Sequence, residues 1–205
     1  MGHKMFTNEQ LDNDYNAVQS AMRDESPLKC ALVGAAFVEK RLGNLLRAAF
    51  VDDASVLERL FGPRGVVETS GAQNDIAMAL GLISESIHWN IVRIQKIRNR
   101  FAHTHLEMDF SDDEIRSHCN TFRFPHVIAT VYVNTKIFRT HLFSDPRERF
   151  ALVASIISTC LGELASKTPR GHVSHLASTW FEDAATHKKG GSLRPGMDDF
   201  PDEPQ

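Results

Sequence analysis

A short basic stretch of this sequence carries the residue types of a metal-free RNA-cleaving site. It reads Arg98-Asn99-Arg100-Phe101-Ala102-His103. A histidine can take a proton from a ribose 2′-hydroxyl or give one to the leaving oxygen. An arginine can hold the phosphate through paired donors and neutralise developing charge. Arg98, Asn99 and His103 are therefore candidate catalytic residues.

A structural role for the same residues is the competing interpretation. Arg98 falls on the apolar side of a predicted helix, where a cation needs a partner, and Glu39 lies within the apolar stripe of another. The two would form a buried ion pair unless Glu39 reaches solvent at its helix edge, and His103 would cap a helix C-terminus. Residues five apart on a straight helix point roughly 140° away from each other. Arg98 and His103 would thus converge only at a loosened helix end or across a two-fold dimer interface.

Nucleic-acid contact is predicted for the cations of this stretch, Arg93, Lys96 and Arg100. No acidic residue occurs between positions 91 and 105, although the whole chain has a net charge of −3. That balance argues against a general polyanion binder, whose domain would be basic throughout. A helix-turn-helix is also excluded, because its second helix must be polar and exposed, whereas this helix is apolar.

Motifs for metals and cofactors are weak. His103 and His105 are two residues apart with Glu107 nearby, but no third histidine completes a site, and His172 and His175 form an equally weak pair. No Gly-rich phosphate loop, nucleophile elbow or Cys–His pairing is present. We expect neither a metal nor a cofactor.

The apolar spacing predicts helices along most of the chain. Their ranges are 7–23, 28–50, 53–61, 71–83, 84–104, 111–120 and 147–167, with a shorter one over 173–187. Ser26 before Pro27 caps the second helix, Thr69 or Ser70 caps the fourth, and Ser111 with Glu114 forms a capping box. The segment 122–143 is β-branched but has no partner strand, so we expect it to be irregular or weakly helical.

The predicted inward faces follow from the same spacing. The expected core residues are Leu11, Tyr15, Val18 and Met22; Leu32, Ala35, Leu42, Leu46 and Ala49; Ile76, Ala79, Leu80 and Ile83; Ile87, Ile91, Ile94 and Phe101; and Phe150, Val153, Ile157, Leu161 and Leu164. At 205 residues the chain has room for one such core.

Bulk features favour a cytoplasmic protein without a membrane span. The three cysteines are far apart and lack a CxxC pairing, which predicts reduced thiols rather than a disulfide. The first residues contain no apolar signal-peptide region, and no uninterrupted apolar run approaches the ~20 residues of a membrane span.

Five motifs in order resemble the bacterial mannitol operon repressor family. They occupy residues 35–42, 60–65, 79–83, 97–103 and 110–115 within a similarity over roughly 28–120. The resemblance implies an all-α, dimeric cytoplasmic regulator that lacks a recognisable DNA-binding motif and binds a regulatory protein partner. The residues themselves predict three parts, with an N-terminal surface helix in 1–25, an α-helical mannitol-repressor-like domain over 26–188 and a disordered tail over 189–205, which is rich in proline and acids and poor in apolar residues.

The motif Arg-Asn-x-x-x-His is also similar to the signature of HEPN domains, which are helical bundles that often act as dimeric, metal-independent ribonucleases. Its residues map onto Arg98, Asn99 and His103. The sequence thus predicts an all-α, HEPN-like single bundle of about six to eight helices that forms a homodimer. Its predicted function is regulation through protein–protein interaction, and the alternative is a ribonuclease of the toxin or defence type acting on RNA.

Overall fold

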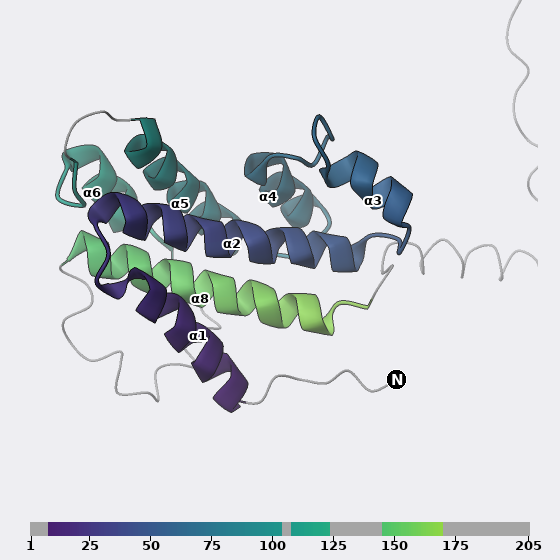
Figure 1. The fold of residues 1–205 in the computed structure, drawn as a ribbon, viewed down its shortest axis with the longest axis horizontal. Coiled ribbons are helices and arrows are strands. Elements are labelled where there is room, and N and C mark those ends of the chain that lie inside the picture. The colour runs from purple at the N-terminus through teal and green to yellow at the C-terminus, as the bar shows by residue number, and fades with distance from the viewer. Residues whose placement is uncertain (1–7, 104–107, 124–144, 170–205) are drawn as a thin grey trace, which may run out of the picture.

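The fold is a bundle of α-helices. The computed structural model describes residues 8–103, 108–123 and 145–169, and these contain seven helices and no strand (Figure 1). The helices are α1 (Asn8–Arg23), α2 (Pro27–Ala49), α3 (Ala54–Phe61), α4 (Ser70–Ala79), α5 (Glu85–His103), α6 (Asp113–Asn120) and α8 (Pro146–Lys167). The predicted all-α bundle is therefore confirmed. The predictions for 122–143 (beyond Arg123), 173–187 and the tail 189–205 lie outside the described residues.

Helices α2 and α8 form the centre of the bundle and run side by side in the same direction (Figure 1). Helix α1 packs across both, and α5 packs against the opposite side of α2. The largest fully buried side chains come from α1, α2, α5, α6 and α8, among them Met22, Leu42, Ile94, Ile115 and Phe150. One continuous core therefore joins elements from both ends of the sequence.

Gly34 allows α1, α2 and α8 to approach closely at one point. A Cβ atom at this position would lie 2.8 Å from both the Met22 sulfur and a ring carbon of Phe150. Both of those side chains are fully buried and have little room to shift. The absence of a side chain at Gly34 thus sets how tightly the three helices pack.

The guanidinium of Arg147 ties the start of α8 to the end of α1. Its Nη2 donates hydrogen bonds to the backbone carbonyls of Met22 at 3.3 Å, Arg23 at 3.2 Å and Glu25. These carbonyls have no partner within α1, because the last turn of a helix leaves its acceptors free. Arg147 therefore caps a helix from more than 120 residues away and holds α1 on the bundle.

Most helix starts lie where the sequence predicts them. The side chains of Ser26, Asp53, Thr69 and Asp145 each accept a hydrogen bond from a backbone N–H in the first turn of their helix. The predicted capping box at Ser111 is wrong, since α6 begins at Asp113. The Ser111 amide and hydroxyl instead donate to Asp109 Oδ1 at 2.6 Å, which removes Ser111 from the capping position.

The predicted helix over 71–83 is too long. Helix α4 ends at Ala79, because Gly81 adopts a left-handed conformation at φ 68° and the Leu82 amide donates back to the Ala77 carbonyl. The inward face also differs from the prediction, since Ala79 and Leu80 are exposed. Asn74 and Ala77 are buried in their place.

In α2 the predicted inward stripe is correct except at Leu32, which is 36% exposed. Helix α8 is long and apolar enough to cross a membrane, with a mean hydropathy of 1.4. However, 61% of that stretch is buried among the other helices. Its composition is thus that of a central core helix.

The three cysteines are free thiols, as the sequence predicts. Burial raises the pKa of Cys30, and it raises the pKa of Cys119 and of Cys160 to about 12. Because only the thiolate is nucleophilic, we expect a disulfide reagent at pH 8 to label the folded protein roughly two orders of magnitude more slowly than the urea-unfolded protein. Rapid labelling of one thiol under native conditions would contradict this burial.

Candidate functional site

Helix α5 positions the predicted site residues at the edge of its buried face. That face consists of Ile87, Asn90, Ile91, Ile94, Ile97 and Phe101. Because a helix turns 100° per residue, the side chains that border this buried face lie where α5 contacts the adjacent helices α2 and α4. Gln95 and Arg98 are partly buried there, whereas Asn99 is exposed. The predicted apolar stripe of α5 is confirmed, with Ile97 and Asn90 added.

A polar pocket of about 410 Å³ opens between α2, α4 and α5. It is lined by Glu39, Thr69, Ser70, Gly71, Gln95, Arg98 and Asn99. Thr69 caps α4 by accepting from the Ala72 amide at 3.2 Å, and Gln95 Nε2 donates to Ser70 Oγ at 2.7 Å. The start of α4, with its outward-facing N–H groups, is thereby held against α5. The pocket combines a guanidinium, a carboxylate and amide donors.

Glu39 and Arg98 share this pocket without forming the predicted buried ion pair. Within the described residues, no salt bridge with an N–O distance up to 4.0 Å involves either side chain. Arg98 Nη1 instead donates to the neighbouring Asn99 Oδ1 at 2.9 Å. Both charged groups keep access to water because the pocket is open, so neither needs to be neutralised. The Arg98 guanidinium is therefore available to an anion.

His103 is the last residue of α5, and its side chain is exposed. The lining of the pocket, as far as the chain is described, includes Arg98 and Asn99 but not His103. Within a single chain the histidine and the arginine thus remain separate, as their spacing predicts. His105 and Glu107, the other parts of the weak metal motif, lie outside the described residues.

Comparison with known proteins links this bundle to a solved structure. A chain of the X-ray structure of the MtlR–HPr complex from Escherichia coli superposes with a TM-score of 0.56 at 15% sequence identity. The match covers 73% of this chain and 99% of that chain. The fold is MtlR-like. No protein-family model and no curated protein sequence matches the chain.

The cations predicted to contact nucleic acid have different environments in this MtlR-like fold. Arg93 stacks on the ring of Trp89, 4.1 Å from its centroid, and Arg100 forms an ion pair with Glu114 at 2.8 Å. Lys96 is exposed and has no ion pair with a described residue. The three side chains therefore do not form a continuous basic surface, because Glu114 neutralises Arg100.

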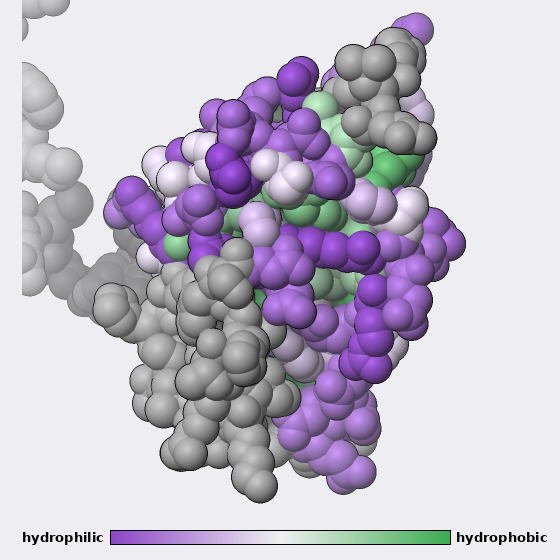
Figure 2. Space-filling view, turned by 90° about the vertical axis from the view of Figure 1, so that its left-hand side faces the viewer, coloured by the Kyte–Doolittle hydropathy of each residue, from purple (hydrophilic) through white to green (hydrophobic). Residues whose placement is uncertain are grey.

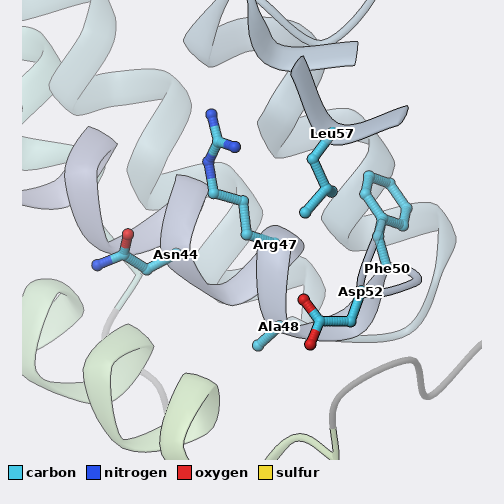
Figure 3. Close-up of a pocket in the computed structure, with 6 residues that line it drawn as sticks. All are labelled: Asn44, Arg47, Ala48, Phe50, Asp52 and Leu57. Atoms are coloured by element: carbon cyan, nitrogen blue, oxygen red, sulfur yellow. The ribbon is translucent and has the colours of Figure 1, made fainter. Parts of the chain in front are cut away.

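A second pocket, of about 270 Å³, lies where α2 ends and α3 begins (Figure 3). It is lined by Asn44, Arg47, Ala48, Phe50, Asp52 and Leu57. Phe50 and Leu57 form one side, and the guanidinium of Arg47 is held 4.2 Å from the ring centroid of Phe61. This pocket joins apolar and charged groups and is not evident from the sequence.

Four residues that line the first pocket are not predicted from the sequence as site residues, namely Thr69, Ser70, Gly71 and Gln95. The sequence predicts Thr69 or Ser70 only as a helix cap, a role that Thr69 takes. No local signal identifies the three residues at the start of α4, because the pocket depends on α4 packing against α5. Gln95 alone offered a hint, as a polar residue between the buried Ile94 and Ile97.

Proposed function

We propose that this chain is a cytoplasmic regulatory protein that acts by binding another protein. The observation that supports the proposal is the MtlR-like fold, because the E. coli neighbour is in complex with HPr. The ordered motifs over residues 28–120 support the same conclusion from the sequence. On this proposal the chain binds an HPr protein of its own organism and needs no metal or cofactor.

Direct binding tests this function. We expect calorimetric titration of the purified chain with HPr of the same organism to give a dissociation constant of about 10⁻⁶ M, typical of a transient regulatory contact. The E. coli MtlR and HPr proteins provide the positive control. No heat of binding at hundred-micromolar concentrations, with the control pair active, would refute the HPr-binding form of the proposal.

We also propose that the chain forms a homodimer. The exposed apolar residues Leu28 and Leu32 lie one turn apart on α2 and would be covered by a second copy. Light scattering should then give about twice the chain mass of 23.0 kDa at micromolar concentration. A monomer at that concentration would exclude this association.

A second candidate function is metal-independent RNA cleavage by Arg98, Asn99 and His103. The observation that favours it is the open pocket, in which Arg98 and Asn99 meet while the guanidinium forms no ion pair with a described carboxylate. In this alternative Glu39 supports the site, and Arg93, Lys96 and Arg100 contact the RNA. Since His103 does not line the pocket of its own chain, the histidine of a second copy would have to reach it.

RNA cleavage in the presence of a chelator separates the two functions. A ribonuclease would leave 2′,3′-cyclic phosphate or 3′-phosphate ends, and His103→Ala would lower its rate by roughly 10²-fold or more. Arg98→Lys would also be impaired, because an ammonium cannot provide the planar two-donor grip. The regulatory function predicts no cleavage at all, so an inert wild-type protein on several RNAs would exclude the ribonuclease.

A further inference from the structure

Helices α5 and α6 pack against each other along a polar contact, here called the seam, which runs from Trp89 and Thr121 to Arg100 and Glu114. At one end, Trp89 Nε1 donates to the Thr121 carbonyl at 2.8 Å. At the other end, Arg100 pairs with Glu114 at 2.8 Å. Positions 89, 93, 96 and 100 are three or four residues apart, so they share one side of α5, and Glu114 and His118 share one side of α6. The helices therefore run antiparallel, with His118 opposite the middle of the row.

The middle of this seam carries positive charge that no described carboxylate neutralises. Partial burial lowers the pKa of His118, and the charges of Arg93 and Lys96 lower it further. The one acid in the seam that would oppose them, Glu114, is bound by Arg100. The Nε atom of Arg93 is buried and has no hydrogen-bond partner among the described residues. Arg93, Lys96 and His118 thus place cationic or protonatable groups in the middle of the seam, and one donor of Arg93 is left without an acceptor among the described residues.

Several contacts hold the Trp89 end of the seam in place. The guanidiniums of Arg93 and Arg123 both lie 4.1 Å from the centroid of its ring, and Arg123 is also paired with Glu85 at 2.7 Å. The buried side chain of Asn90 holds the backbone of Arg123, accepting from its amide at 2.7 Å and donating to its carbonyl. Arg93 is therefore presented in a fixed place, which lowers the entropic cost of binding an anion.

We propose that Arg93, Lys96 and His118 receive an acidic side chain of a protein partner, an inference that rests on the proposed protein-binding function. The distribution of charge favours a carboxylate over a nucleic acid. The seam offers unneutralised cations over one helical turn only, and the ion-paired acids Glu85 and Glu114 lie at its ends. A phosphodiester chain needs a longer basic stripe, because it places a charge on every nucleotide.

The surface around the seam fits a local contact of this kind. Figure 2 views the end of the molecule that carries α6, and its described surface is mostly hydrophilic with smaller hydrophobic areas between. On the outer side of α6, Arg116 is neutralised by Asp113 at 2.5 Å. On the α8 side, Arg149 donates to Asn120 at 2.5 Å. Arg116 and Arg149, which flank the seam, therefore already have partners. We expect a partner's carboxylate to be attracted to the middle of the seam, where the cations have none among the described acids.

Binding of poly-glutamate peptide to the full chain tests the site, with poly-glutamine as the uncharged control peptide. We expect Lys96→Glu to weaken poly-glutamate binding at least tenfold. Lys40→Glu makes the same charge change at an exposed position of α2 and should alter binding less than twofold. Equal losses in both variants would mean that only net charge matters, and the proposal would fail.

The His118 imidazole provides an independent readout by NMR. A bound carboxylate favours the imidazolium, so poly-glutamate should raise the pKa of His118, and binding should strengthen as pH falls from 8 to 6. His118→Gln should remove this pH dependence and leave binding at pH 8 in place. An unchanged pKa at saturation would overturn the site. So would an RNA oligonucleotide that binds more tightly than the peptide and is equally sensitive to Lys96→Glu.

The same variants separate this proposal from the proposed function. If HPr binds the wild-type chain and the Lys96→Glu variant equally well while poly-glutamate binds neither, the regulatory function stands and the seam is not its docking site. If poly-glutamate binding depends on Lys96 but HPr does not bind, the site stands and HPr is the wrong partner. Circular dichroism should be unchanged in both variants, since Lys96 and Lys40 are exposed.

Discussion

Phe150→Ala should lower the free energy of unfolding by about 3–5 kcal/mol. Phe150 is fully buried at the start of α8, and its ring packs against Phe110, with 5.3 Å between centroids. Phe110 packs in turn against Phe101 of α5 at 5.1 Å. Removing the Phe150 ring therefore leaves a cavity where α1, α2, α8 and the segment before α6 meet, and close packing prevents full collapse.

Urea unfolding monitored by circular dichroism measures this effect. Val66→Ala is the matched control, because Val66 is 74% exposed and its truncation should change stability by no more than about 0.5 kcal/mol. A loss below about 1 kcal/mol for Phe150→Ala would show that the α2–α8 contact is not the centre of the core.

Asn90→Leu is expected to cost about 2–3 kcal/mol, the second largest effect. Asn90 is fully buried in α5, and its side-chain amide satisfies both the amide and the carbonyl of Arg123. A leucine has similar volume but no hydrogen-bonding atoms, so two polar backbone groups would lose their partner in a partly buried place. The segment after α6 should then loosen from Trp89.

Two measurements follow the Asn90→Leu variant. Urea unfolding gives the loss of stability, and Trp89 fluorescence should change because Arg123 would no longer be held over the ring. Asn16→Leu, an exposed change in α1, serves as the control and should be near neutral. Full stability together with altered fluorescence would mean that water replaces the lost hydrogen bonds.

Acidity should also affect stability through His118. Its pKa is lowered in the folded protein, by partial burial first and then by Arg93 and Lys96. The unfolded chain therefore binds more protons between its ordinary pKa near 6.5 and the lower folded value. The contribution of His118 to the free energy of unfolding is fully present above about pH 6.5 and is lost as the pH falls towards the lower folded pKa. His118→Gln should therefore make the free energy of unfolding less dependent on pH in this range.

Local chemistry predicted where most helices begin. Ser26 and Thr69 cap their helices as predicted, because a side-chain oxygen can accept a hydrogen bond from the first turn without help from the surrounding fold. Ser111 does not cap α6, because its backbone amide and its hydroxyl both donate to the neighbouring Asp109 carboxylate. Helix α4 ends earlier than predicted because Gly81 adopts a left-handed backbone conformation, which the spacing of apolar residues does not reveal.

The candidate site was only partly predictable. The chemistry of Arg98, Asn99 and His103 follows from residue type, but the pocket that Arg98 enters depends on α4, whose first residues lie more than 25 positions earlier. The approach of Ser70 to Gln95 is decided by helix packing, and no local pattern contains it. The seam around His118 likewise exists only because α6 folds back along α5.

The sequence by itself determined most of the helices and, apart from α4, most of their buried faces, because backbone hydrogen bonding and apolar burial act on local spacing. Tertiary structure alone decided which charges meet. Glu39 and Arg98 face one pocket unpaired, while Arg41 pairs with Asp14 and Arg100 with Glu114. An exposed ion pair contributes at most about 1 kcal/mol, whereas burying one large apolar side chain contributes about 1.5–3 kcal/mol. Burial of the apolar faces therefore decides how the helices pack against one another, and the charged side chains pair with whichever opposite charges this packing brings close.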